Sequence, residues 1–358
     1  MSKTNVTAMA IGANLSTTIS TVLSFFYLYN YYKKSRKDIW QDVNLSVKYK
    51  QDKPKVIIKK IIAVSMPMSL SSILSSISKN IDSITVVRGL KTFLTEGAAK
   101  IQYGILTGKV DTLTTLPLSF NIAFATALVP ALAGALAVGD EKAATRRVSF
   151  SLLITMLIGL PCTAGLCVLA EPILQLLFPN APGGGTLLAI SSLAIIFTVL
   201  SQTINGALQG IGKVLVPAIA LGIGVGVKFI LNIILVPIPW IGANGAAVGS
   251  VVCNIISFAI GYYVLNKNMR LDLKFSKFII KPIIATLMMS VCTLSTYFIF
   301  SGIILEILAT IISLIISVII YVILIFILRI FTKEDIMMLP NGEKLYKVLI
   351  KCKIYKTQ

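Results

Sequence analysis

Nine long apolar runs divide this sequence and limit what it can fold into. Each run has about 20 residues or more, which is the length an α-helix needs to cross the hydrocarbon core of a bilayer. They cover residues 6–32, 61–88, 101–138, 148–178, 186–211, 214–236, 246–265, 282–300 and 303–330. Inside lipid, every backbone polar group must be satisfied within its own segment, which favours helices. The sequence therefore predicts an all-α, polytopic membrane protein with about nine transmembrane helices.

The charged residues lie mostly between these runs. Only 13% of the 358 residues are charged, compared with about 25% in an average soluble domain. The net charge of +19 comes from Lys and Arg that gather on alternate loops and on the tail 332–358. Cytoplasmic loops carry such an excess, so we expect a multi-pass protein of the cell membrane with a cytoplasmic C-terminus. Cations placed this way do not indicate a nucleic-acid partner.

Two residue types exclude several kinds of site. The chain has no histidine, which excludes histidine catalysis and histidine metal ligands. Its five cysteines have no CxxC spacing, and four of them lie inside apolar runs. A membrane-embedded transferase would need a pair of carboxylates of the DxxD type on a loop, and the sequence has none. We therefore predict no enzyme activity, no metal and no cofactor.

The run 61–88 is unusual because it is both apolar and rich in serine. On a helix, one polar stripe would hold Ser65, Ser69, Ser72, Ser76, Lys79 and Ser83. A second stripe beside it would hold Ser71, Ser75, Ser78 and Asp82, and Arg88 follows near the end. Charged side chains at membrane depth are costly and nearly always face a bundle interior or a wet cavity. The pattern indicates a helix that lines a water-filled cavity for something anionic, although the serines alone also suit packing between helices.

Later runs also carry polar groups at helical spacing. Gln202 and Asn205 share one face of the run 186–211, and Lys228 lies within the next run. These side chains suit a second wall of the cavity. They equally suit hydrogen bonds between neighbouring helices.

Five stretches in order resemble one family, the polysaccharide-biosynthesis and stage V sporulation protein B group, which belongs with the lipid II flippases. They are PMSLSSILSSISKNIDSITVVRGL, YGILTGKVDTLTTLPLSFNIAFATALVPAL, IGLPCTAGLCVLAEPILQLLF, INGALQGIGKVLVPAIALGIGVGVKFILNIILVPIP and GANGAAVGSVV. The resemblance covers nearly the whole chain. It implies two six-helix lobes around a central cavity, followed by two extra helices.

On that plan the chain divides into five parts. They are the last helix of an otherwise missing N-terminal lobe (1–32), a basic cytoplasmic linker (33–60), a C-terminal six-helix lobe (61–266), two extra transmembrane helices (267–331) and a basic cytoplasmic tail (332–358). The first five helices of the family pattern are absent from the sequence. We expect the DNA upstream of Met1 to encode them.

The resemblance implies a flippase for an undecaprenyl-diphosphate-linked precursor of peptidoglycan, spore cortex or polysaccharide, working by alternating access. Its partners would be the lipid-linked sugar diphosphate, membrane lipids and a coupling H⁺ or Na⁺. The predicted substrate-binding residues are Lys79, Asp82, Arg88, Lys109, Asp111, Gln202, Asn205 and Lys228. The alternatives are a cation-coupled multidrug exporter, and a non-transporting fragment or partner subunit.

Overall fold

The computed structural model describes residues 3–45, 53–181, 183–271, 273–303 and 305–337, together with tail positions 342, 343, 346 and 350. The chain divides into two units, Met1–Lys60 and Ile61–Gln358. The first unit holds helix α1 (Lys3–Leu45) and the beginning of helix α2 (Pro54–Leu90).

The predicted linker 33–60 is helical over most of its length. Helix α1 continues from the apolar run through the basic segment to Leu45, and α2 starts at Pro54. Residues 33–45 contain no Gly or Pro and are rich in Lys, Arg and other helix formers. Proline suits the first position of a helix, where its missing N–H is not needed. Positions 46–52 lie outside the described residues.

The second unit continues with helices only. After α2 come α3 (Glu96–Gly104), the π-helix η1 (Ile105–Val110), α4 (Asp111–Ala137), α5 (Glu141–Val168), α6 (Ala170–Leu177), α7 (Gly185–Gly210), α8 (Val216–Leu235), α9 (Asn244–Met269), the π-helix η2 (Ser276–Ile280), α10 (Lys281–Ser301), α11 (Glu306–Ile327) and α12 (Lys333–Met337). No strand occurs in the part of the chain that the structure describes.

Eight helical segments among the described residues are long and apolar enough to cross a membrane. They correspond to eight of the nine predicted runs, and the ninth run, 6–32, lies within α1. The predicted fold class, an all-α polytopic membrane protein, is confirmed.

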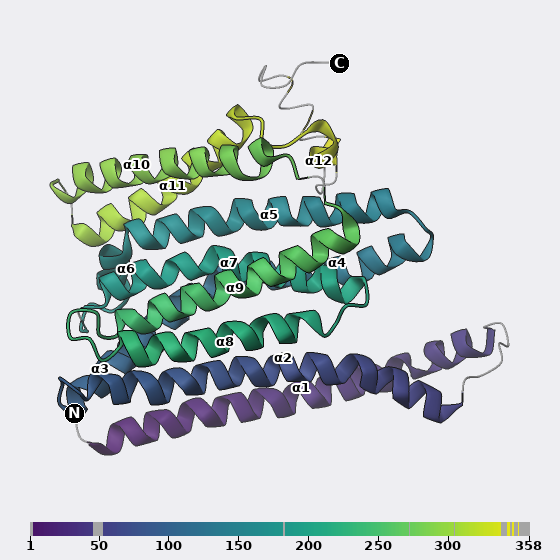
Figure 1. Cartoon of the computed structure of the whole chain (residues 1–358), viewed down its shortest axis with the longest axis horizontal. Coiled ribbons are helices and arrows are strands. Elements are labelled where there is room, and N and C mark those ends of the chain that lie inside the picture. The colour runs from purple at the N-terminus through teal and green to yellow at the C-terminus, as the bar shows by residue number, and fades with distance from the viewer. Residues whose placement is uncertain are drawn as a thin grey trace. The chain divides into compact units, whose positions relative to one another are not determined.

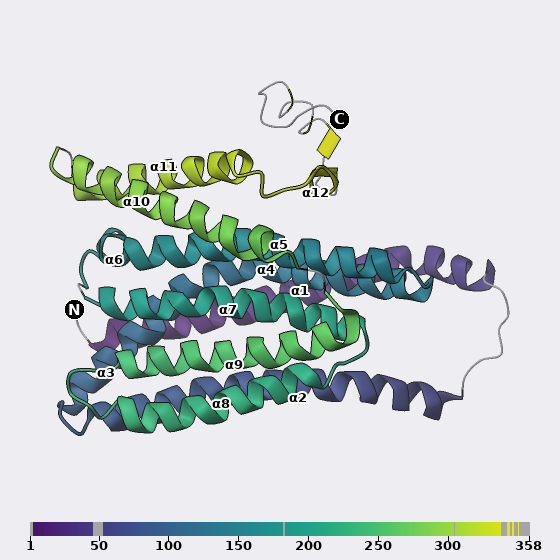
Figure 2. The same cartoon turned by 45° about the horizontal axis from the view of Figure 1, so that its top comes forward.

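Helix α7 occupies the centre of the second unit and packs against α4, α5 and α9 (Figures 1 and 2). Helix α8 pairs with α9, while α10 packs against α11 and α5. Glycines allow two of these close approaches. A Cβ atom on Gly206 would lie 2.5 Å from the Ala125 carbonyl oxygen of α4, and one on Gly224 of α8 would lie 2.7 Å from the Cys253 carbonyl oxygen of α9.

Two helix boundaries differ from the expectation. The charged segment 139–147, between the apolar runs 101–138 and 148–178, forms only a short turn. The Asp140 carboxylate accepts a 2.9 Å hydrogen bond from the Ala143 N–H and caps α5, which begins at Glu141. The run 148–178 is not one segment. Helix α5 ends at Val168, and the short helix α6 completes the run.

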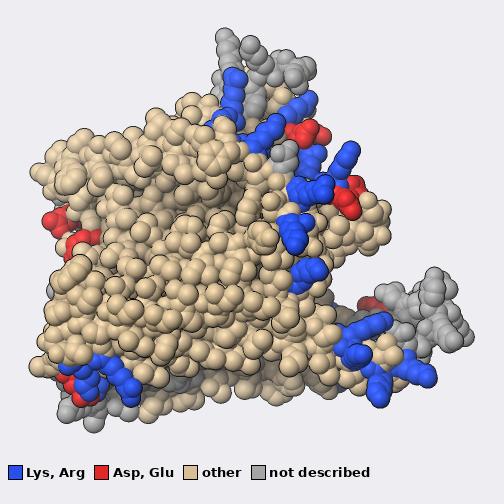
Figure 3. All heavy atoms as spheres, in the orientation of Figure 1, with Lys and Arg blue, Asp and Glu red and all other residues tan. Residues whose placement is uncertain are grey.

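Lys and Arg gather at one end of the second unit. Figure 3 shows them along the side where α5 begins and α9 and α11 end. The cations there include Lys142, Arg146, Lys213, Lys267 and Lys274. The loops that are rich in Lys and Arg in the sequence therefore lie together at one end of the second unit.

Candidate functional site

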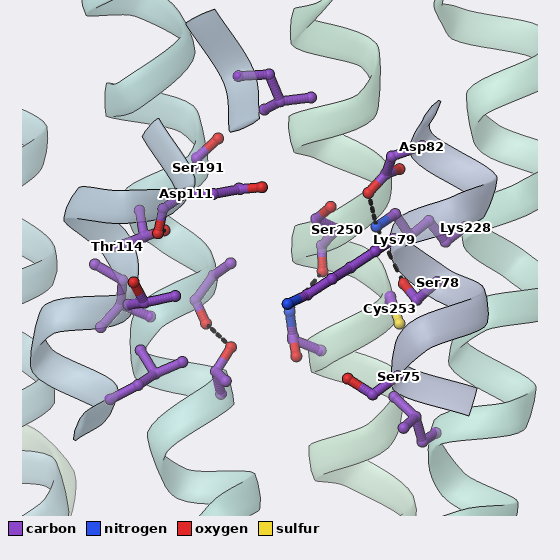
Figure 4. A pocket seen from close by; sticks show the side chains of 18 residues that line it. Ser75, Ser78, Lys79, Asp82, Asp111, Thr114, Ser191, Lys228, Ser250 and Cys253 are labelled. Carbon is purple, nitrogen blue, oxygen red and sulfur yellow. Dashed lines mark hydrogen bonds and ion pairs between the residues drawn. The ribbon is translucent and has the colours of Figure 1, made fainter. Parts of the chain in front are cut away.

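A pocket of about 270 Å³ lies among the spanning helices of the second unit. Its walls come from α2, η1, α4, α7, α8 and α9 (Figure 4). Its lining includes Ser75, Ser78, Lys79, Asp82, Asp111 and Lys228. Four of the eight predicted site residues therefore meet in one place, namely Lys79, Asp82, Asp111 and Lys228.

Helix α2 presents its second serine stripe to this pocket. Ser75, Ser78 and Asp82 line it, and Lys79 joins them from the edge of the first stripe. Ser72 and Ser76, of the first stripe, are exposed and donate hydrogen bonds to carbonyls of their own helix four residues earlier. Helical periodicity groups these residues correctly, but the packing of α2 on α8 decides which group faces the pocket.

Asp82 and Lys228 form the best-buried ion pair of the described spanning helices. The Lys228 ammonium lies 2.5 Å from the Asp82 Oδ2 atom, and the two side chains are only 6% and 16% exposed. Lys228 also donates to the Ser78 hydroxyl at 3.2 Å. Such a pair is tolerable at membrane depth only because each charge has its partner and further hydrogen bonds.

Asn232 completes this cluster from the next turn of α8. Its amide nitrogen donates to Asp82 Oδ1 at 2.9 Å and to the Thr85 hydroxyl at 3.0 Å. Asn232 was not among the predicted site residues, although it lies four residues after Lys228. That spacing places two polar groups on one helix face and was the available signal.

Lys79 and Asp111 lie on opposite walls of the pocket. In Figure 4 the Lys79 side chain leaves α2 and extends into the space between the walls, away from the Asp82–Lys228 pair. Asp111 stands on the other wall with Thr114 and Ser191. Within the described ranges, neither group forms an ion pair. The pocket thus offers one cation and one carboxylate that a ligand can reach.

Lys109 differs from the expectation. Its side chain is buried, with 8% exposure, and its ammonium donates to the backbone carbonyls of Ala181 and Gly183. The ammonium also lies 5.4 Å from the centre of the Phe178 ring. Lys109 belongs to η1 and reaches the loop after α6, so it holds that loop and does not line the pocket.

Three further predicted residues also lie outside the pocket lining. Arg88 is exposed near the end of α2. Gln202 accepts a 3.1 Å hydrogen bond from Asn121 of α4, which matches the alternative reading of that face as a contact between helices. Asn205 lies one turn further along α7. A role for these three in substrate binding stays a prediction.

The described residues contain no group of three or more His, Cys, Asp or Glu that could hold a metal ion. The lining of the pocket supplies hydroxyl, ammonium and carboxylate groups, so the chemistry that it offers is polar and electrostatic. It can receive a hydrated or charged group between hydroxyls, one ammonium and one carboxylate, inside a bundle that otherwise meets lipid.

Comparison with known proteins points to one family. A family model described as Lipid II flippase MurJ matches residues 1–323. The chain is 28% identical over 305 residues to the uncharacterized membrane protein YabM of Bacillus subtilis (strain 168), covering 82% of this chain and 56% of that protein. It is 23% identical over 275 residues to stage V sporulation protein B of the same organism, covering 75% and 51%.

Two flippases are also similar. The lipid II flippase MurJ of Bacillus subtilis (strain 168) is 27% identical over 170 residues, or 46% of this chain and 30% of that protein. A solved structure of lipid II flippase MurJ in an inward closed conformation superposes with a TM-score of 0.54 at 19% identity, covering 74% of this chain and 52% of the other. The latter likeness shows the fold. YabM, stage V sporulation protein B and the solved MurJ structure each match most of this chain. The chain spans only about half the length of each of them.

Proposed function

This chain belongs to the lipid II flippase MurJ family, and on that premise we propose that it moves an undecaprenyl-diphosphate-linked precursor of cell wall or polysaccharide across the membrane. The resemblance stated from the sequence is confirmed, and the family is one of transporters. The activity of this particular chain is a proposal, and the pocket supports it.

The observation that carries the proposal is Lys79. Its ammonium extends into the pocket, where the side chain is exposed and has no ion pair among the described residues. A diphosphate head group needs such a cation, because charge pairing is much stronger away from bulk water. The lipid tail would stay in the bilayer while the head group crosses.

The other charged groups have separate proposed roles. Lys228 is already neutralised by Asp82, so this pair would fix α2 against α8 and leave Lys79 to meet the substrate. Asp111 faces the same space from α4. It would balance the charge of Lys79 in the empty pocket, or carry the coupling H⁺ or Na⁺.

Alternating access of this six-helix lobe against a second lobe would then expose the pocket to each side of the membrane in turn. In this scheme the basic end of the second unit faces the cytoplasm. The expectation follows the same excess of cations that sets the orientation of other membrane proteins.

Reconstitution can test the role of Lys79 directly. The full chain is placed in proteoliposomes with a fluorescent undecaprenyl-diphosphate-linked sugar, and the fraction of lipid that changes leaflet is followed over time. Lys79→Ala should slow transfer about 10-fold or more, since a hydrogen bond to a charged group contributes about 1.5–3 kcal/mol. Lys79→Arg keeps the charge and should retain part of the activity.

Lys142→Ala is the matched control, because Lys142 is an exposed cation at the start of α5 and lies outside the pocket. It should leave transfer unchanged. Full activity of Lys79→Ala would remove Lys79 from the substrate path. If the unmodified chain transfers none of the lipid, the proposed function of this chain is wrong.

A further inference from the structure

A second pocket lies at the end of the second unit where α2 ends and α9 begins. Figure 1 shows this end of the helices opposite the start of α5. We call it the end pocket. It has a volume of about 380 Å³ and forms where the turn between α2 and α3, the start of α7 and the turn between α8 and α9 meet. Its size falls in the range of about 300–1,000 Å³ that small-molecule sites span.

The walls of the end pocket are held by specific contacts. The Thr92 hydroxyl donates to the Gly89 carbonyl at 2.7 Å and lies 3.5 Å from the Pro237 carbonyl, which ties the two turns together. Lys109 binds the carbonyls of Ala181 and Gly183, directly before Gly184 in the pocket lining. The Gly242 N–H donates to the Ile238 carbonyl at 2.8 Å. The end pocket is therefore preformed.

The lining is neutral, and it combines an aromatic face with amides and a hydroxyl. None of its thirteen residues is charged. Trp240 is 83% exposed, so most of its indole is available for contact. Gln102, Thr186 and Asn244 supply hydrogen-bond donors and acceptors, and within the described ranges none of the three side chains is engaged in a hydrogen bond.

We propose that the end pocket binds the saccharide part of the lipid-linked precursor as it leaves the protein. The C–H face of a pyranose ring suits an indole, and its hydroxyl and acetamido groups suit amide and hydroxyl side chains. A diphosphate would need cations, which this lining does not supply. The inference rests on the proposed function for its choice of ligand. The competing explanation is that Trp240 only anchors the protein at the membrane interface, as tryptophans commonly do.

Fluorescence separates these explanations, because Trp40 and Trp240 are the two tryptophans of the chain. Trp40→Phe leaves Trp240 as the single emitter in the full-length protein, held in nanodiscs. Adding a free disaccharide of N-acetylglucosamine should change the Trp240 emission, and the change should saturate as the concentration rises. Inorganic pyrophosphate should have no effect on the emission. Nanodiscs with brominated phospholipids then report whether the indole lies in the bilayer.

Gln102→Ala combined with Asn244→Ala should weaken disaccharide binding at least several-fold while leaving the brominated-lipid signal unchanged. Asn268→Ala is the matched control, because it removes an exposed amide at the opposite end of α9. Strong quenching by brominated lipid with no saturable response to disaccharide would overturn the proposal. The proposal would also be overturned if the double variant bound the disaccharide with the same affinity as the protein without these two substitutions.

The outcome is independent of the transport assay. A chain that transfers lipid but shows no disaccharide response keeps the proposed function and loses this inference. A chain that binds disaccharide through Trp240 without transferring lipid keeps the saccharide site and loses the proposed function.

Discussion

At the scale of single residues, the decisive feature is which charges already have partners. Lys228 and Asp82 neutralise each other, and Lys109 is bound to two carbonyls. Of these three lysines, Lys79 is the one that is free to meet a ligand, in the pocket that Asp82 and Asp111 also line. The sequence shows all three lysines inside apolar runs but does not separate these roles.

The Asp82–Lys228 pair gives a double-mutant test. Asp82→Asn or Lys228→Met alone should each destabilise the protein by about 3–5 kcal/mol, because each leaves an uncompensated buried charge. The double variant should recover most of that loss. The measurement is the unfolding midpoint of purified protein in mixed detergent micelles.

Lys91→Met is the control for this cycle, since Lys91 belongs to an exposed pair with Glu96 and should cost at most about 1 kcal/mol. If the stability loss of the double variant equals the sum of the losses of the two single variants, the two charges do not depend on each other.

At the scale of elements, a buried hydrogen-bond network joins α4, α5 and α7. Asn121 is fully buried, and its amide nitrogen donates to the Val199 carbonyl at 2.8 Å. Its amide oxygen accepts from Thr155 at 2.9 Å, and Thr155 lies 2.7 Å from Thr203. The network fixes α4, which carries Asp111, against the central helix.

Thr155→Val should therefore destabilise the protein by about 1 kcal/mol, within the range measured for hydrogen bonds between membrane helices. Asn121→Leu should cost more, because it removes several bonds and leaves Thr155 and Gln202 without this partner. Thermal unfolding in detergent measures both.

Thr126→Val serves as the control on α4, because Thr126 is exposed and bonds only to its own helix through the Ile122 carbonyl. It should leave the unfolding temperature unchanged. An equal loss for Thr126→Val and Thr155→Val would contradict a network that joins the helices.

At the scale of the whole molecule, the second unit has one basic end and one end with few cations (Figure 3). The uneven distribution of Lys and Arg among the loops of the sequence predicts the same arrangement. This feature can therefore be predicted without knowing how the helices pack. The turn before α5 belongs to the basic end, while the loops before α7 and before α9 belong to the other.

Single cysteines can test the orientation on a background that lacks the five native ones. Ala181→Cys and Pro239→Cys should react with an impermeant thiol reagent added outside intact cells, and Lys142→Cys should react only after the membrane is opened. All three positions are exposed. Labelling of Lys142→Cys from outside would reverse the proposed orientation.

The sequence by itself determined the helical class, the positions of the spanning segments, the charge asymmetry and the family. These properties depend on local composition and on periods along the chain, which the amino-acid order contains directly. It also grouped Ser75, Ser78 and Asp82 on one face, because helical spacing fixes the angles between residues.

Only the tertiary structure decided how each helix is rotated toward its neighbours. That rotation placed one serine stripe of α2 in the pocket, joined Asp82 to Lys228 and turned Lys109 toward the Ala181 and Gly183 carbonyls. It also assembled the end pocket from three turns that are far apart in the sequence. The partners of a long side chain depend on the distances to nearby groups and on its burial. Both are set only when the helices pack.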